Sequence, residues 1–201
     1  MNHYLVKTVF LTFLLTLTLS AEKKDDNNIY VGIGFGGSAY VDSGFAKEQI
    51  AGVDKDIEKD GIGAKVYAGY QVNKIIGLEV SYVYYGSFKA NDNYEYHAQG
   101  LSAAGNIGYT FLDNQLRPYV LIGLGYIISD FPHDGVDVSD YKPSLHTGLG
   151  LTYVPKVLEG MGFRIAYESN SFNYTLHRGT DKEKSYPQGF GILYLGGEYR
   201  F

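Results

Sequence analysis

Residues Ile62–Tyr84 read IGAKVYAGYQVNKIIGLEVSYVY, and this stretch decides the fold. Apolar or aromatic residues stand at every second position from Ile62 to Tyr70 and again from Ile76 to Tyr84. A period of two is typical of β-strands with one apolar face. The short gap between the two runs contains Asn73, which favours a turn. The stretch therefore predicts two antiparallel strands joined by a tight hairpin.

The same alternation continues along the chain, in Ile29–Gly36, Leu101–Phe111, Tyr119–Tyr126, Leu145–Tyr153, Met161–Glu168 and Leu193–Phe201. Each run is close to the ~9–11 residues that a tilted strand needs to cross a bilayer. Short gaps (72–75, 112–116, 154–160) alternate with long polar ones (40–60, 86–99, 128–143, 169–188). An even number of strands with short turns at one end and long loops at the other is typical of outer-membrane barrels. We therefore predict an all-β fold, an eight-stranded antiparallel up-and-down transmembrane β-barrel with short periplasmic turns and long extracellular loops.

The composition of the second face of each strand decides which face meets lipid. That face is rich in Gly, Ser, Ala and Tyr, whereas a soluble barrel would carry Lys and Glu there. Eight strands enclose only enough space for side chains, which favours small inward residues. Aromatic residues near the strand ends of the apolar face match the interfacial girdles of membrane barrels. The alternative is a soluble periplasmic barrel with its apolar face around a ligand.

The N-terminus has the features of a secretory signal peptide. Residues 1–21 combine Lys7 with an apolar run, Val9–Leu19, and small residues at a cut after Ser20 or Ala21. The run is too short for a spanning helix, which needs about 20 residues. We expect removal of residues 1–21, a short polar segment over 22–28 and a barrel domain over 29–201.

Composition excludes several classes of function. The chain of 201 residues contains no Cys, which excludes disulfides, Cys-ligated zinc and iron–sulfur clusters. A formal net charge of −5 without a basic patch argues against nucleic-acid binding. The five histidines are scattered and form no metal-binding motif. We expect neither a cofactor nor a metal.

Strand parity places eight ionisable side chains in the lumen: Lys65, Glu79, Arg117, His146, Arg164, Glu168, Glu198 and Arg200. An unpaired charge in such a place costs several kcal/mol, so these groups must pair. Our hypothesis is an ion-pair network centred on Glu79 and Arg164 that seals and rigidifies the barrel. The alternative is a narrow ion or solute channel gated by these charges.

Three segments resemble a known family. Gly191–Phe201 resembles the C-terminal strand of outer-membrane barrels, with Leu193, Leu195, Tyr199 and Phe201 at alternating positions. Pro118–Tyr126 and Ile76–Tyr82 resemble strands of small barrels of the outer-membrane protein A and opacity type. The resemblance implies an outer-membrane barrel of a Gram-negative bacterium whose C-terminal signal is recognised by the barrel assembly machinery. Since the sequence stops at this strand, we expect no peptidoglycan-binding domain after it.

The resemblance also implies partners and a rival activity. Outer-membrane lipid and lipopolysaccharide surround such a barrel, and an extracellular partner could bind the loops 40–60, 129–142 and 169–188. Some small barrels are lipid A deacylases with a His-x-Ser-Asn motif. Here Tyr167 stands in the position of the histidine before Ser169 and Asn170, which leaves the serine without an evident base. We therefore expect no enzymatic activity.

Overall fold

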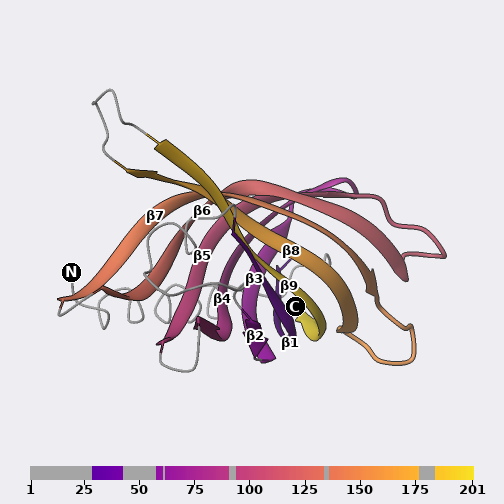
Figure 1. Cartoon of the computed structure of the whole chain (residues 1–201). Coiled ribbons are helices and arrows are strands. Elements are labelled where there is room, and N and C mark those ends of the chain that lie inside the picture. Colours follow the sequence, from indigo (N-terminus) through magenta and orange to yellow (C-terminus); the bar gives the residue numbers. More distant parts are fainter. Residues whose placement is uncertain (1–28, 43–57, 61, 91–93, 134–135, 177–183) are drawn as a thin grey trace.

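The computed structural model describes residues 29–42, 58–60, 62–90, 94–133, 136–176 and 184–201 (Figure 1). The predicted signal peptide and the polar segment that follows it lie outside these residues. The described residues include no helix that is long and apolar enough to cross a membrane.

The described chain is a closed antiparallel barrel, as the alternation predicts. The strand pairings close the ring. β1 pairs with both β3 and β9, β4 pairs with both β3 and β5, and β5 to β9 pair in chain order. The segment β2 pairs with the outer part of β4 and continues the barrel position of β3, so the ring has eight positions. The strands are β1 (Ile29–Asp42), β2 (Glu58–Asp60), β3 (Ile62–Gln71), β4 (Ile76–Ala90), β5 (Tyr94–Gly108), β6 (Leu116–His133), β7 (Val136–Tyr153), β8 (Met161–Leu176) and β9 (Lys184–Arg200).

The two faces of the barrel are the reverse of those in a soluble protein. Large apolar side chains such as Leu124 and Leu195 point outward and are 73% and 67% exposed. Charged side chains such as Lys65 point inward and are fully buried. This apolar outer surface is suited to lipid and not to water. The backbone is also suited to lipid, because a closed ring of strands satisfies its own backbone hydrogen bonds. The alternative of an apolar ligand cavity in a soluble barrel is therefore wrong.

The short turns are held by local hydrogen bonds. The side-chain oxygen of Asn73 accepts from the backbone N–H groups of Ile75 and Ile76, at 2.9 and 2.8 Å. This side-chain bonding replaces a backbone turn and explains why asparagine stands there. In the next short turn, Leu112, Asp113 and Asn114 all have positive φ angles.

The opposite end differs from the prediction in where the strands stop. The β6–β7 pairing continues to His133 and Val136, and the β8–β9 pairing continues to Leu176 and Lys184. Most of 129–142 and 169–188, predicted as loops, is therefore paired strand, and Figure 1 shows the β8–β9 hairpin projecting past the body of the barrel. The sequence of these segments is rich in polar and charged residues, so an apolar alternation does not mark them as strands. Of the predicted loop 40–60, residues 40–42 belong to β1, 58–60 form β2, and the remainder lies outside the described residues.

A β-bulge in β4 changes which side chains enter the lumen. The β4–β5 register shifts by one between Tyr84 and Ser87, and Gly86 has a φ of 85°. A glycine tolerates this conformation without strain. Tyr85 follows the inward parity of Glu79, and the bulge after it turns Phe88 inward as well, so that both rings are fully buried.

Candidate functional site

The lumen is the candidate functional site, and Glu79 on β4 lies at its centre. Its carboxylate accepts from Arg164 Nη1 on β8 at 2.9 Å and from Lys65 Nζ on β3 at 3.0 Å. The hydroxyl of Tyr30 on β1 donates to the same carboxylate at 2.9 Å. One carboxylate thus joins β4 across the interior to β8 on the opposite side of the ring, and also to the nearby strands β3 and β1.

Two further carboxylates extend this network in both directions. Toward the short-turn end, Glu198 accepts from Arg164 Nη2 at 2.9 Å and from Arg200 Nη2 at 2.7 Å. Toward the outer end, Glu168 accepts from Lys65 Nζ at 2.6 Å and from the Tyr194 hydroxyl at 2.7 Å. Arg164 and Lys65 each bridge two carboxylates, so the ion pairs form one chain along the barrel axis.

Arg117 and His146 occupy the two edges of this network. Arg117 Nη1 donates to the side-chain oxygen of Asn106 at 2.5 Å, and its Nη2 donates to the carbonyl of Ile75 at 3.2 Å. His146 Nε2 lies 3.4 Å from a carboxylate oxygen of Glu168. The structure thus brings six of the eight predicted lumen residues into direct ion pairs and places His146 against Glu168, whereas Arg117 makes hydrogen bonds to neutral groups only among the described residues.

Tyrosine rings fill the space between the charges. Arg164 Cζ lies 4.0 Å from the ring centroid of Tyr67, 4.9 Å from that of Tyr119 and 5.4 Å from that of Tyr30. A guanidinium over an aromatic face is favourable by ~0.5–2 kcal/mol, and more so when it is desolvated. The rings therefore both exclude water and support the central cation.

Two layers closer to the outer end were not predicted from the sequence. In the first, Asn170 accepts from the hydroxyls of Ser102 and Ser144 at 3.2 and 3.1 Å and donates to the Tyr85 hydroxyl at 2.7 Å. Alternation along β8 is the signal that could have found Asn170, since it lies two residues beyond Glu168.

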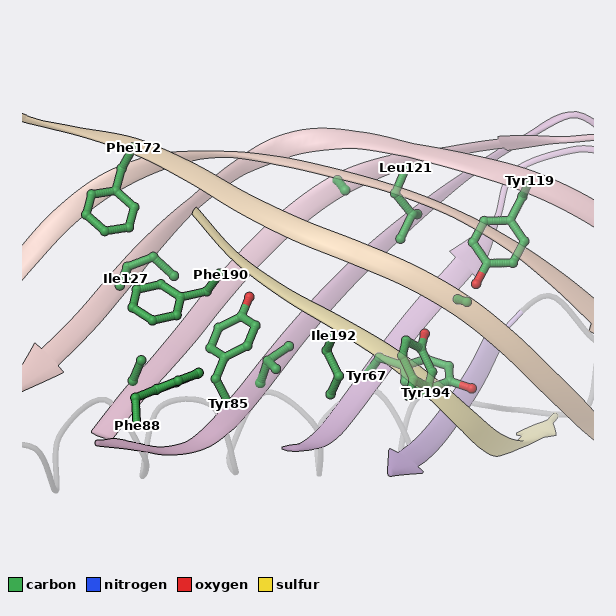
Figure 2. Packing of buried hydrophobic residues seen from close by; sticks show 14 of the residues in the cluster. Tyr67, Tyr85, Phe88, Tyr119, Leu121, Ile127, Phe172, Phe190, Ile192 and Tyr194 are labelled. Atoms are coloured by element: carbon green, nitrogen blue, oxygen red, sulfur yellow. The ribbon is translucent and has the colours of Figure 1, made fainter. Parts of the chain in front are cut away.

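The second layer is aromatic and centres on Phe190. The rings of Tyr40, Tyr85, Phe88 and Phe172 lie with their centroids 4.8, 5.4, 5.5 and 5.9 Å from that of Phe190. Figure 2 shows Phe172, Phe190, Tyr85 and Phe88 gathered at one end of the barrel, with Tyr67, Tyr119 and Tyr194 farther along. Sequence reasoning missed this layer because the bulge at Gly86 shifts the parity of β4 and because β8 and β9 continue past their alternating parts.

The segment that resembles a deacylase motif does not converge on one face. Glu168 and Asn170 point into the lumen and are buried, while Ser169 between them lies on the outward face of β8. Among the described residues no group of three or more His, Asp or Glu side chains is placed to hold a metal.

The C-terminal strand presents its alternating residues to the outside. Leu193, Leu195 and Tyr199 are 55%, 67% and 47% exposed, and Phe201 is 37% exposed. The strand β9 closes the ring between β8 and β1, and the Phe201 N–H donates to the Ile29 carbonyl at 2.9 Å.

Comparison with known proteins agrees with this architecture. A sequence model of the OmpA-like transmembrane domain matches residues 24–201. The chain belongs to this family. This OmpA-like barrel is 27% identical over 187 residues to outer membrane protein A of Escherichia fergusonii, covering 92% of this chain and 51% of that protein. It is 34% identical over 109 residues to outer membrane protein A of Salmonella typhi, covering 53% of this chain and 29% of that protein. The OmpA-like barrel thus spans about half or less of these curated relatives.

Solved structures show the same fold. Neisserial surface protein A (NspA) matches with a TM-score of 0.61 at 16% identity, covering 89% of this chain and 100% of that chain. The attachment invasion locus protein Ail of Yersinia pestis matches with a TM-score of 0.55 at 19% identity, covering 87% of this chain and 99% of that chain. At these identities the likeness concerns the fold alone. With the family match, it places this OmpA-like barrel in the outer membrane of a Gram-negative bacterium.

Proposed function

We propose that this OmpA-like barrel is a closed, non-enzymatic outer-membrane protein that anchors surface hairpins in the membrane. The observation that carries the proposal is the filling of the lumen along its axis. The inward residues of β8 pass through these layers one after another. Arg164 and Glu168 belong to the ion-pair chain, Asn170 belongs to the hydrogen-bonded layer around its side-chain amide, and Phe172 belongs to the aromatic layer.

Each layer opposes the passage of water-soluble molecules for a different reason. The ion pairs fix their side chains by charge-assisted hydrogen bonds, which are about twice as strong as neutral ones. The aromatic layer around Phe190 is apolar, and apolar constrictions in pores exclude water and ions. A solute would have to pass the ion-pair chain, the layer around Asn170 and the aromatic layer to cross the barrel.

The outer surface supports the structural part of the proposal. Outward apolar side chains contact outer-membrane lipid and lipopolysaccharide, and the alternating residues Leu193, Leu195, Tyr199 and Phe201 form the signal for the barrel assembly machinery. The barrel carries the outer parts of the β6–β7 and β8–β9 strand pairs, which are described as far as His133 and Val136 and as far as Leu176 and Lys184. Surface segments on a rigid scaffold are where partners bind, so these hairpins and the segment 40–60 carry the extracellular interaction.

A narrow channel is the second candidate, and the position of Lys65 favours it. Lys65 contacts both Glu79 and Glu168. A shift of the Lys65 ammonium toward one carboxylate would loosen its contact with the other carboxylate, and the lysine would remain paired. Such an exchange of ion pairs could open the charged part of the lumen. The aromatic layer around Phe190 would still have to open.

Solute uptake by proteoliposomes tests the proposal. We expect vesicles that contain the purified barrel to behave like vesicles without protein, which do not swell in an isosmotic pentose solution. Swelling that depends on the amount of the wild-type barrel would overturn the closed lumen.

The absence of enzymatic activity has a separate test. Lipid A from cells that express the barrel should have the same mass as lipid A from cells that express the Ser169→Ala variant. A difference in acyl-chain content between the two would contradict a non-enzymatic role.

A further inference from the structure

The three short turns carry apolar side chains at exposed positions. Val157, in the turn 154–160, is 87% exposed, the largest fraction for any large apolar side chain in the described part of the chain. Leu112, in the turn 112–115, is 66% exposed, and Ile75, in the turn 72–75, is 50% exposed. A turn that faces water is ordinarily built from Gly, Pro, Asn, Asp and Ser. These three side chains, the turn tips, therefore suit a less polar surrounding than water.

Two contacts hold the second and the third turn side by side. The Asp113 carboxylate lies 3.0 Å from Lys156 Nζ, and the Val154 N–H donates to the Gln115 carbonyl at 2.7 Å. Each of the two turn tips is the sequence neighbour of one of these charged partners, so both tips lie on the same rim of the barrel. Figure 1 shows the short turns at the end of the barrel opposite to the projecting β8–β9 hairpin.

Leu112 has a backbone conformation that leucine rarely adopts. Its φ angle is 51°, in the left-handed region where a Cβ atom is crowded by the backbone. Asp113 and Asn114 share this conformation, but short polar side chains tolerate it better. The Leu112 carbonyl accepts from the backbone N–H and from the side-chain amide of Gln115, each at 3.1 Å, which holds the turn. Strained residues cluster at functional positions, and an exposed leucine has only an apolar contact to offer there.

The lipid-facing belt ends directly beside these turns. On β6 it runs from the outward ring of Tyr126 to Leu116, which pairs with the outward Tyr153. At about 3.4 Å per residue and a tilt of about 40°, this part of β6 rises about 26 Å, which matches the ~25 Å apolar band of such barrels. The headgroup layer adds about 5–8 Å on each side of the hydrocarbon core. Since the turn 112–115 directly precedes Leu116, it lies at the level of the headgroups.

The charges of the short turns balance one another. Lys74 and Lys156 are matched by Asp113 and Glu159, and the three turns contain no other charged residue. Both lysines are exposed. A lysine can keep its stem on an apolar surface while its ammonium group reaches a phosphate. A neutral rim of apolar tips and exposed lysines therefore fits a phospholipid interface.

We propose that the short-turn end of the barrel is a docking surface for the phospholipid headgroup layer of the periplasmic leaflet, into which Leu112 and Val157 insert. The surface continues the lipid-facing belt and has the same occupant. This contact fixes the depth of the barrel in the membrane, and with it the length by which the β6–β7 and β8–β9 strand pairs project on the opposite side. It goes beyond the anchoring role proposed above and does not depend on a closed lumen.

Tryptophan fluorescence tests this surface, because the chain contains no tryptophan of its own. The full barrel with Val157→Trp is placed in phosphatidylcholine nanodiscs, in which both ends of the barrel are open to solvent. Two reference variants are Leu124→Trp in the lipid-facing belt and Asn173→Trp at an exposed position of the β8–β9 pair.

Brominated phosphatidylcholines then report the depth of each indole ring. We expect bromine near the headgroup end of the acyl chains to quench Val157→Trp, and deeper bromine to quench Leu124→Trp more strongly. Asn173→Trp should be quenched by neither and should remain open to aqueous acrylamide. If Val157→Trp is as open to acrylamide as Asn173→Trp and no brominated lipid quenches it, the turn tips face water and the proposal is overturned.

A cysteine variant gives a second measurement with a smaller side chain. The chain contains no cysteine, so Val157→Cys carries the only thiol of the barrel. We expect a water-soluble maleimide to modify it more slowly than Asn173→Cys, both in nanodiscs and in opened outer-membrane fragments. Equal rates in both settings would contradict the lipid contact. Protection in the membrane fragments but not in nanodiscs would also overturn it and would identify a periplasmic protein as the occupant.

Discussion

Replacing Glu79 by alanine is the perturbation whose size follows most directly from the structure. The Glu79 carboxylate accepts from Arg164, Lys65 and Tyr30 at 2.9, 3.0 and 2.9 Å. Removing one partner of a buried ion pair costs about 3–5 kcal/mol, because the other charge is left uncompensated. Here Arg164 keeps Glu198 and Lys65 keeps Glu168, so we expect the lower end of that range. A loss of about 3 kcal/mol lowers the folding equilibrium constant by about two powers of ten.

The assay is reversible urea unfolding of the barrel in phospholipid vesicles, followed by tyrosine fluorescence and by the mobility of unboiled samples on detergent gels. A double-mutant cycle with Arg164→Met isolates the pairwise energy, and we expect a coupling of about 1–3 kcal/mol. Asp113→Ala is the control, since Asp113 pairs with Lys156 on the surface and exposed pairs contribute about 0–1 kcal/mol. A Glu79→Ala effect no larger than that of Asp113→Ala, with no coupling to Arg164→Met, would refute the network as a source of stability.

Three further predictions follow from the packing and the C-terminal strand. Phe190→Ala should lower the free energy of unfolding by about 3–5 kcal/mol, because it empties the centre of the aromatic layer; a loss below 1 kcal/mol in the urea assay would contradict that packing. Gly36→Ala should impair folding, since its added Cβ would overlap the carbonyl oxygen of Leu193, while Gly37→Ala, with open space around its added Cβ, should fold normally on the same gels. Deletion of Phe201 should reduce the amount of heat-modifiable barrel in outer-membrane fractions, and unchanged assembly would argue against the C-terminal signal.

The barrel could be predicted from the sequence because lipid imposes a simple pattern on it. Each strand crosses an apolar solvent on one side and a packed lumen on the other, so Ile62–Tyr70 shows strict alternation and Lys65 falls on the inner face. The same parity fixes the place of Glu79 and Arg164, since a slip of one residue would expose both charges to lipid.

The outer third of the barrel could not be predicted in this way. There the paired segments are rich in polar residues and their sequence does not alternate, as in β8 around Asn173 and in β9 around Tyr186. The bulge at Gly86 then reverses the parity of β4, which moves Phe88 inward. The choice of ion-pair partners could not be predicted either, because nothing in one sequence specifies that Lys65 bridges two carboxylates while Arg117 contacts none among the described residues.

Planar-bilayer conductance tests the closed lumen most directly. We expect no conductance steps above the baseline from the wild-type barrel, from Glu79→Ala or from Phe190→Ala, because in each of them the ionic layer or the aromatic layer remains intact. The combined Glu79→Ala and Phe190→Ala variant should conduct, since the ionic and the aromatic layers are both broken and the layer around Asn170 that remains is polar. Stable conductance steps from the wild-type barrel that change with Glu79→Ala alone would contradict the account and identify a channel gated by its ion pairs.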